Sequence, residues 1–96
     1  MNVTYRIDNE ILYIALEGRI DASNAAVAEQ KIFDIKLENN DKHVVLDADF
    51  LEYISSAGLR VVLKLRKECP KLAIINVSPD VYEIFDMTGF TDMVKV

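Results

Sequence analysis

The chain turns from a predicted strand into a predicted helix at the stretch Tyr53-Ile54-Ser55-Ser56-Ala57-Gly58-Leu59-Arg60. A serine just ahead of a helix can cap it, because the hydroxyl oxygen accepts a hydrogen bond from a free N–H group of the first turn. A phosphate also suits this place, since the same N–H groups and the helix dipole favour negative charge. The local pattern leaves two interpretations open: a helix N-cap, which is the commoner use of serine, or a serine that is phosphorylated as a switch.

The residues after this turn repeat with the spacing of an amphipathic helix from Ala57 to about Glu68, and Cys69-Pro70 ends it. Gly58 lies in the first turn, where the lack of a side chain lets another backbone or a partner come close. The outer face presents three basic residues, Arg60, Lys64 and Lys67. Such a stripe is typical of a solvated helix face, and a contact with a partner is the alternative.

Strands are predicted on both sides of this helix. Continuous apolar runs from His43 to Ala48 and from Lys71 to Val77 predict buried strands, the first central, buried on both faces and parallel to its neighbour. Near the start, residues 3–7 alternate between apolar and polar, and residues 11–17 are apolar on both faces. These two segments predict an antiparallel hairpin, with one buried face on the first strand and the second strand inside the sheet.

The sequence also predicts the turn of this hairpin and the end of its second strand. Asp8-Asn9-Glu10 predicts its turn, because these residues tolerate left-handed conformations, and Gly18-Arg19-Ile20-Asp21 is predicted to break the second strand. Apolar residues then recur at spacings of three and four from Ala25 to Leu37, which predicts an amphipathic helix. Asp21 and Ser23 are its candidate N-caps, and a left-handed residue at Asn39-Asn40 is its predicted end.

Ser78-Pro79 is a strong start signal for a last, short helix, because serine caps and proline suits the first helical position. Gly89 is the predicted end of that helix, and residues 90–96 predict a short final strand. The predicted order is β-β-α-β-α-β-α-β. It indicates an α/β fold in one domain, residues 1–96, with a mixed sheet: the N-terminal antiparallel hairpin joined to parallel βαβ units, with helices packed against it.

Charge and composition argue against some classes of partner. The 96 residues carry a formal charge of −5, which argues against a nucleic-acid-binding face. The single cysteine, Cys69, cannot staple the fold, so the chain is expected to be intracellular, reduced and cytoplasmic. We expect no membrane partner, because no stretch approaches the ~18 continuous apolar residues of a membrane span.

Signatures of enzymes are missing from the sequence. One histidine and one cysteine cannot form a zinc set, and no phosphate-binding glycine loop is present. His43 is predicted at the opposite end of the sheet from the serines, which argues against a Ser-His-Asp triad. Four carboxylates are expected to cap helices and keep the surface soluble, with paired acid–base or metal chemistry as the alternative: Asp21, Asp47, Asp49 and Glu52. We therefore expect no catalytic residue, no metal and no cofactor.

Five segments, in this order and at this spacing, give the chain a family resemblance: Leu16-Glu17-Gly18-Arg19-Ile20-Asp21, His43-Val44-Val45-Leu46-Asp47, Leu51-Glu52-Tyr53-Ile54-Ser55-Ser56-Ala57-Gly58-Leu59, Val77-Ser78-Pro79 and Ile84-Phe85-Asp86-Met87-Thr88-Gly89-Phe90. Over nearly its whole length the chain resembles a STAS domain. Within that superfamily it is similar to the bacterial anti-sigma factor antagonists. The resemblance implies a single STAS-like domain.

The resemblance also implies a phosphorylation site. In the family, an aspartate precedes the serine that takes the phosphate, followed by a hydroxyl residue, glycine and leucine. In this chain Ser55 stands at the aspartate position and Ser56 at the phosphoacceptor position, followed by Ala57. Ser56 is thus the implied phosphoacceptor, with Ser55 as the alternative. Asp21 matches the acidic residue that lies beside the switch in the family.

The implied function is partner switching. The unphosphorylated protein would bind a serine-kinase-type anti-sigma factor and release its sigma factor, the kinase would phosphorylate Ser56, and a phosphatase would reset the cycle. A monomer or weak dimer is expected. The implied partner surface comprises Asp21, Ser23, Ser55, Ser56, Ala57, Gly58, Leu59 and Arg60. The alternatives are a non-catalytic scaffold subunit of a larger signalling assembly, in which Ser56 is only a cap, and a STAS module that binds a nucleotide or lipid.

Overall fold

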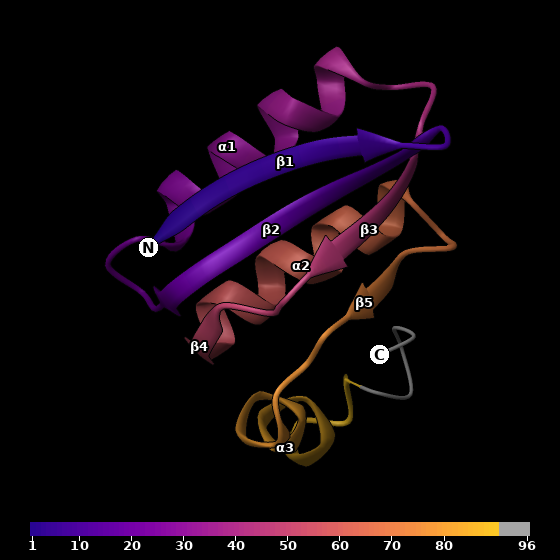
Figure 1. Cartoon of the computed structure of the whole chain (residues 1–96). Helices are drawn as coiled ribbons and strands as arrows, with labels where there is room; N and C mark the ends of the chain where they lie inside the picture. Colours follow the sequence, from indigo (N-terminus) through magenta and orange to yellow (C-terminus); the bar gives the residue numbers. More distant parts are fainter. Residues whose placement is uncertain (91–96) are drawn as a thin grey trace.

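The computed structural model describes residues 1–90 and shows a mixed sheet with three helices (Figure 1). The strands are β1 (Asn2–Asp8), β2 (Ile11–Ile20), β3 (His43–Asp47), β4 (Leu51–Ile54) and β5 (Ala73–Ile75). The helices are α1 (Ala25–Glu38), α2 (Ser56–Glu68) and α3 (Pro79–Met87). The predicted final strand falls on residues 90–96, and all but its first residue lie outside the described part.

The predicted α/β class and mixed sheet are confirmed. The strand path is β1-β2-β3-β5, with β4 paired to β2 off this path. β1 pairs with β2 antiparallel, and the other pairings are parallel. The hairpin turn uses Asn9 and Glu10 at φ of 50° and 66°, so the predicted left-handed turn is also correct.

Strand β2 is longer than predicted. It continues through Gly18 to Ile20, so the prediction that this segment breaks the strand is wrong. Gly18 has φ of 81° at a register shift where β2 leaves β3 and pairs with β4. Glycine adopts this left-handed backbone conformation without the strain that a Cβ would add. The strand can therefore bend at Gly18 and pair with a second partner.

Strand β4 was not predicted, and it adds one strand to the expected order. Its four residues leave little room for a periodic pattern, and only Leu51 and Ile54 are buried. The strand exists because the far end of β2 supplies a parallel partner, from Gly18↔Leu51 to Ile20↔Ile54. That partner lies far away in the sequence, so local residues could not indicate it.

The core lies between the sheet and helices α1 and α2, which run behind it in Figure 1. Strand β2 buries Leu12, Ile14 and Leu16 on this side, while its alternate residues stay half-buried. The predicted buried face of β1 is found only at Val3, since Tyr5 and Ile7 are 48% and 45% exposed. β1 is an edge strand, so its side chains have neighbouring strands on one side only.

The ends of α1 differ from the prediction. Its N-cap is Asn24, which makes no side-chain cap, so neither Asp21 nor Ser23 caps this helix. At the other end Asn39 has φ of −130°, which is not left-handed. Its side-chain nitrogen donates to the carbonyl of Ile35 at 2.9 Å instead. The Asn39 side chain thus satisfies a carbonyl at the end of the helix, where a left-handed residue was expected.

The predictions for α3 are correct at both ends. Ser78 caps the helix by accepting a hydrogen bond from the N–H of Val81 at 3.3 Å, and Pro79 is the first helical residue. Gly89 follows the C-cap with φ of 72°. Both signals are local, which is why the sequence alone could place them.

Candidate functional site

The two segments that were singled out as a site lie side by side at one end of the sheet. Strands β2 and β4 end together, with Ile20 paired to Ile54. The N–H of Ser55 donates to the carbonyl of Ile20 at 2.8 Å, which joins the turn into α2 to the loop that begins at Asp21. This edge holds the carboxyl ends of parallel strands, where sites in open α/β sheets gather.

The two serines of the turn have different roles. Ser55 is the N-cap of α2, and its hydroxyl oxygen accepts from the N–H of Gly58 at 3.4 Å. Ser56 is the first residue of the helix and is exposed. The interpretation in which Ser56 serves only as a helix cap is therefore wrong, because Ser55 occupies that position.

Asp21 is held in a small network beside the turn. One carboxylate oxygen of Asp21 accepts from the hydroxyl of Ser23 at 2.5 Å and from its N–H at 2.9 Å. The Ser23 hydroxyl, then its N–H and the nearby charge of Arg19, lower the pKa of Asp21 below its ordinary value. Asn24 completes the loop by accepting from the N–H of Asp21 at 3.0 Å. The turn into α2 therefore has an ionised carboxylate beside it at neutral pH.

Gly58 and Leu59, both in the predicted partner surface, are buried within the chain. A Cβ at Gly58 would lie 2.6 Å from Cγ1 of Ile54 and 2.9 Å from Cγ2 of Ile20. The close approach that this glycine allows is thus to β2 and β4 of its own fold. The other six residues of the predicted surface are exposed or half-buried: Asp21, Ser23, Ser55, Ser56, Ala57 and Arg60.

One residue of the basic stripe of α2 forms an ion pair within the domain. The ammonium group of Lys64 lies 3.0 Å from the carboxylate of Glu29 on α1. Arg60 and Lys67 are exposed. Because Arg60 lies one turn after Ser56 on the same helix, it is the member of the stripe closest to the turn.

Of the remaining candidate residues, Asp47 and Asp49 lie close together, and His43 lies far from the serine turn. His43 pairs with Ile11 at the start of β2, about 30 Å along the strand from Ile20 at ~3.3 Å per residue, as expected. None of Asp21, Asp47, Asp49 and Glu52 is a helix N-cap, so the expectation that they cap helices is wrong. Within residues 1–90 no group of histidine, cysteine, aspartate and glutamate could hold a metal ion.

Cys69 is the C-cap of α2, and burial raises the pKa of its thiol, which keeps it protonated at neutral pH. Across residues 1–90, the helices are all too short or too polar to span a bilayer.

One contact beside the site was missed by sequence reasoning. The guanidinium of Arg19 lies 4.4 Å from the ring centroid of Tyr53, an arrangement typical of a cation–π contact. The two residues are cross-strand partners in the β2–β4 pair. Only knowledge of β4 could have revealed the contact, because the sequence separates the two residues widely.

The chain is similar to known proteins over nearly its whole length. The STAS domain family profile matches residues 2–96. The protein named "Putative anti-sigma factor antagonist BtrV" from Bordetella bronchiseptica is 34% identical over 100 residues, covering 100% of this chain and 85% of that protein.

Solved structures show the same fold. An anti-sigma factor antagonist from Mycobacterium paratuberculosis aligns with a TM-score of 0.84 at 18% identity, covering 97% of this chain and 81% of the other. The Bacillus antagonist SpoIIAA aligns in its phosphorylated form with a TM-score of 0.67 at 18% identity, covering 97% and 88%. Its unphosphorylated form aligns with a TM-score of 0.75 at 19% identity, covering 97% and 85%. The chain belongs to the STAS domain family, among the bacterial anti-sigma factor antagonists.

Proposed function

We propose that this protein is a cytoplasmic anti-sigma factor antagonist without catalytic activity of its own. The unphosphorylated form binds a serine-kinase-type anti-sigma factor, which then releases its sigma factor. The kinase phosphorylates Ser56 and ends the interaction, and a phosphatase restores the binding form. The protein acts as a monomer or weak dimer.

One observation supports this proposal most directly. Ser56 is exposed at the first position of α2, while Ser55 makes the cap. The Ser56 hydroxyl can therefore be modified without the loss of the cap hydrogen bond. The helix N-terminus tolerates the added phosphate, since its N–H groups and dipole favour negative charge. The modification then changes the surface and leaves the fold in place.

The charge of the phosphate explains how binding would end. A phosphoserine adds about −1.5 to −2 charges and three acceptor oxygens. Asp21 is already ionised in the adjoining loop, so the added phosphate creates a concentrated negative patch. A partner surface that fits the neutral hydroxyl would have to desolvate this patch. A penalty of about 1.4 kcal/mol weakens binding tenfold, so a few kcal/mol are enough to end the complex.

The test is a pull-down from the native host's lysate with Ser56→Ala and Ser56→Asp as baits. Ser78→Asp is the matched control, because it places the same charge at the N-terminus of another helix while keeping a good cap residue. The Ala bait and the control should retain a small ATPase of the anti-sigma type, and Ser56→Asp should lose it. Incubation of the retained ATPase with ATP should phosphorylate the wild-type chain at residue 56, as read by peptide mass.

One result would refute the switch, and a second would refute the assignment of the phosphate to Ser56. Equal retention of the same partners by both Ser56 variants would favour the scaffold alternative. Phosphate found on Ser55 alone would move the modification to the cap residue, where it would cost the hydrogen bond to Gly58.

A further inference from the structure

The helices of residues 1–90 leave one face of the sheet open, and we call it the open face. The core-facing residues of β2, such as Leu12 and Ile14, pack in one cluster with Ile32 of α1 and Leu65 of α2. The alternate residues of β2 point to the opposite side, because side chains alternate across a strand. On the open face the side chains of β2 are half-buried, and Val45, which pairs with Tyr13, is buried.

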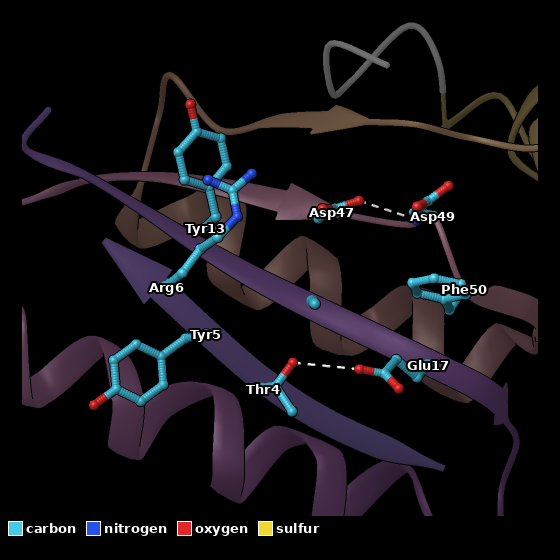
Figure 2. A pocket seen from close by; sticks show the side chains of 9 residues that line it. Thr4, Tyr5, Arg6, Tyr13, Glu17, Asp47, Asp49 and Phe50 are labelled. Carbon is cyan, nitrogen blue, oxygen red and sulfur yellow. Dashed lines mark hydrogen bonds between the residues drawn. The ribbon is translucent and has the colours of Figure 1, made fainter. Parts of the chain in front are cut away.

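A hollow of about 220 Å³ lies on the open face, between β1, β2, β3 and the loop before β4 (Figure 2). The strand register explains its position. Ala15 pairs with Thr4 on one side and with Asp47 on the other. Along β2, the next residues on the same face are Tyr13 and Glu17, which are much larger. The methyl group of Ala15 thus forms a low floor within a ring of longer side chains.

The charges around this hollow are unequal. Three carboxylates line it, from Glu17, Asp47 and Asp49, against the single guanidinium of Arg6. Figure 2 shows Arg6 beside Tyr13 at one end, with the acidic residues toward the other. Arg6 already lies over the ring of Tyr13, 3.9 Å from its centroid. The acidic end therefore favours a cation.

The carboxylates of the hollow keep free acceptor capacity. Glu17 accepts from the hydroxyl of Thr4 at 3.3 Å. Asp47 accepts from the N–H of Asp49 at 3.0 Å and from the side-chain nitrogen of Asn76 at 3.1 Å. An ionised carboxylate offers about four lone-pair positions, so both groups are oriented by the protein and can still accept from a ligand.

Phe50 adds an aromatic surface at the acidic end. Its side chain is 68% exposed, although it lies on a turn whose backbone is firmly held. The carbonyl of Phe50 accepts from the N–H of Gly18 at 2.9 Å, and the N–H of Leu51 donates to the carbonyl of Ala48 at 3.1 Å. An exposed aromatic ring beside carboxylates suits a flat cation, because guanidinium stacks on rings and hydrogen-bonds carboxylates in pairs.

We infer that the open face is a second docking surface, which binds an arginine side chain of a partner protein. The guanidinium packs on Phe50 and donates hydrogen bonds to Glu17, Asp47 and Asp49, while the aliphatic part of the side chain covers Ala15. The chain shows the same chemistry in its own Arg6–Tyr13 contact. None of the residues that line the hollow belongs to the Ser56 turn, and this binding needs no phosphate.

The inference can be tested by NMR titration of the isotope-labelled full chain with a short capped peptide of alternating arginine and leucine. A peptide with glutamate in place of arginine is the control probe. The amides of residues 13–18 and 47–51 should shift with the arginine peptide alone. The affinity should fall as salt rises, since exposed charges are screened.

Matched variants assign the binding to the hollow. The combination Glu17→Gln, Asp49→Asn and Phe50→Ser should weaken the peptide about tenfold or more, as expected for lost charge-assisted hydrogen bonds. The control combination Asp80→Asn, Tyr82→Ser and Glu83→Gln removes equivalent groups from α3 and should leave the affinity unchanged. Ser56→Asp should also leave it unchanged, which separates this surface from the proposed switch.

Several outcomes would overturn the inference. Absence of binding, equal binding of the glutamate peptide, or an equal loss in the α3 control would each do so. Shifts of residues 13–18 that depend on protein concentration without peptide would make a second copy the occupant. Peptide-driven shifts of residues 91–96 along the same curve would make the chain's own last segment the occupant. Loss of binding in Ser56→Asp would assign the hollow to the switch surface.

Discussion

Helices α2 and α3 both begin after a serine N-cap, and the two caps have similar geometry. The hydroxyl oxygens of Ser55 and Ser78 accept from the N–H groups of Gly58 and Val81 at 3.4 and 3.3 Å. The next positions differ. In α3 they are a proline and Asp80, an acidic residue that complements the helix dipole permanently. In α2 they are Ser56 and an alanine, with no acidic residue in the first turn.

This difference suggests why only one of the two helix starts suits a switch. Asp80 already supplies the negative charge that the N-terminus of α3 favours. The N-terminus of α2 lacks such a charge of its own and presents an exposed hydroxyl in its place. A phosphate on Ser56 would supply the negative charge that Asp80 provides permanently in α3. Unlike Asp80, a phosphate can be removed again.

The largest expected effect is at the third helical position, which is Gly58 in α2 and Val81 in α3. Gly58→Val should destabilise the domain by about 3 kcal/mol or more, because the new atoms overlap Ile54 and Ile20 and overpacking forces strands and helix apart. Val81, the matching residue of α3, is fully buried, and Val81→Ala should cost less. Chemical denaturation of both variants measures the difference. An equal or smaller cost for Gly58→Val would show that the strands can yield.

The cap residues should show the next largest effect. Ser55→Ala and Ser78→Ala should each reduce the free energy of unfolding by about 1 kcal/mol, since each leaves a helix N–H without its acceptor. Ser56→Ala should change stability by less than about 0.5 kcal/mol, as exposed substitutions usually do. The measurement is the midpoint of chemical denaturation, compared between variants whose unfolding free energy has the same dependence on denaturant concentration. A larger loss for Ser56→Ala than for Ser55→Ala would reverse the assignment of the two serines.

A smaller effect is expected from the charge in the first turn of α3. Asp80→Asn should cost about 0.5 kcal/mol at low ionic strength, because the carboxylate interacts favourably with the helix dipole. The cost should shrink when salt is added. Glu83→Gln lies later in the same helix and is the control, with a smaller expected change. A cost of Asp80→Asn that is independent of salt would point to a role other than dipole complementation.

The smallest expected effect is the pH dependence that Asp21 contributes. Its pKa is lowered in the folded chain, so its stabilisation is complete above the unfolded pKa of about 3.9 and is lost as the pH falls through the folded value. Asp21→Asn should remove this part of the acid sensitivity and leave the pH dependence of stability above about pH 5 unchanged. Unfolding free energies of both proteins across the acid range provide the test. An acid profile unchanged by Asp21→Asn would show that its network with Ser23 adds nothing to stability.

Those features of the candidate site that depend on residues close together in the sequence were predictable. The serine pair, the helix after it and Asp21 were all recognised from sequence patterns and the family resemblance. The cap role of Ser55 was not, because it depends on where the first helical residue falls. Gly58 was recognised as a place of close approach, but the approaching groups, Ile20 and Ile54, could be named only once β2 and β4 were paired.

Local sequence patterns alone predict the three helices, both ends of α3, the hairpin turn and the mixed α/β class. These features arise from interactions within a few residues, such as a hydroxyl with the third N–H after it, or from a repeating apolar pattern. Three features could be recognised only in the folded chain: strand β4, the change of partner at Gly18 and the hollow over Ala15. Each of these depends on strand register between segments far apart in the chain, and register is set by the packing of the whole sheet.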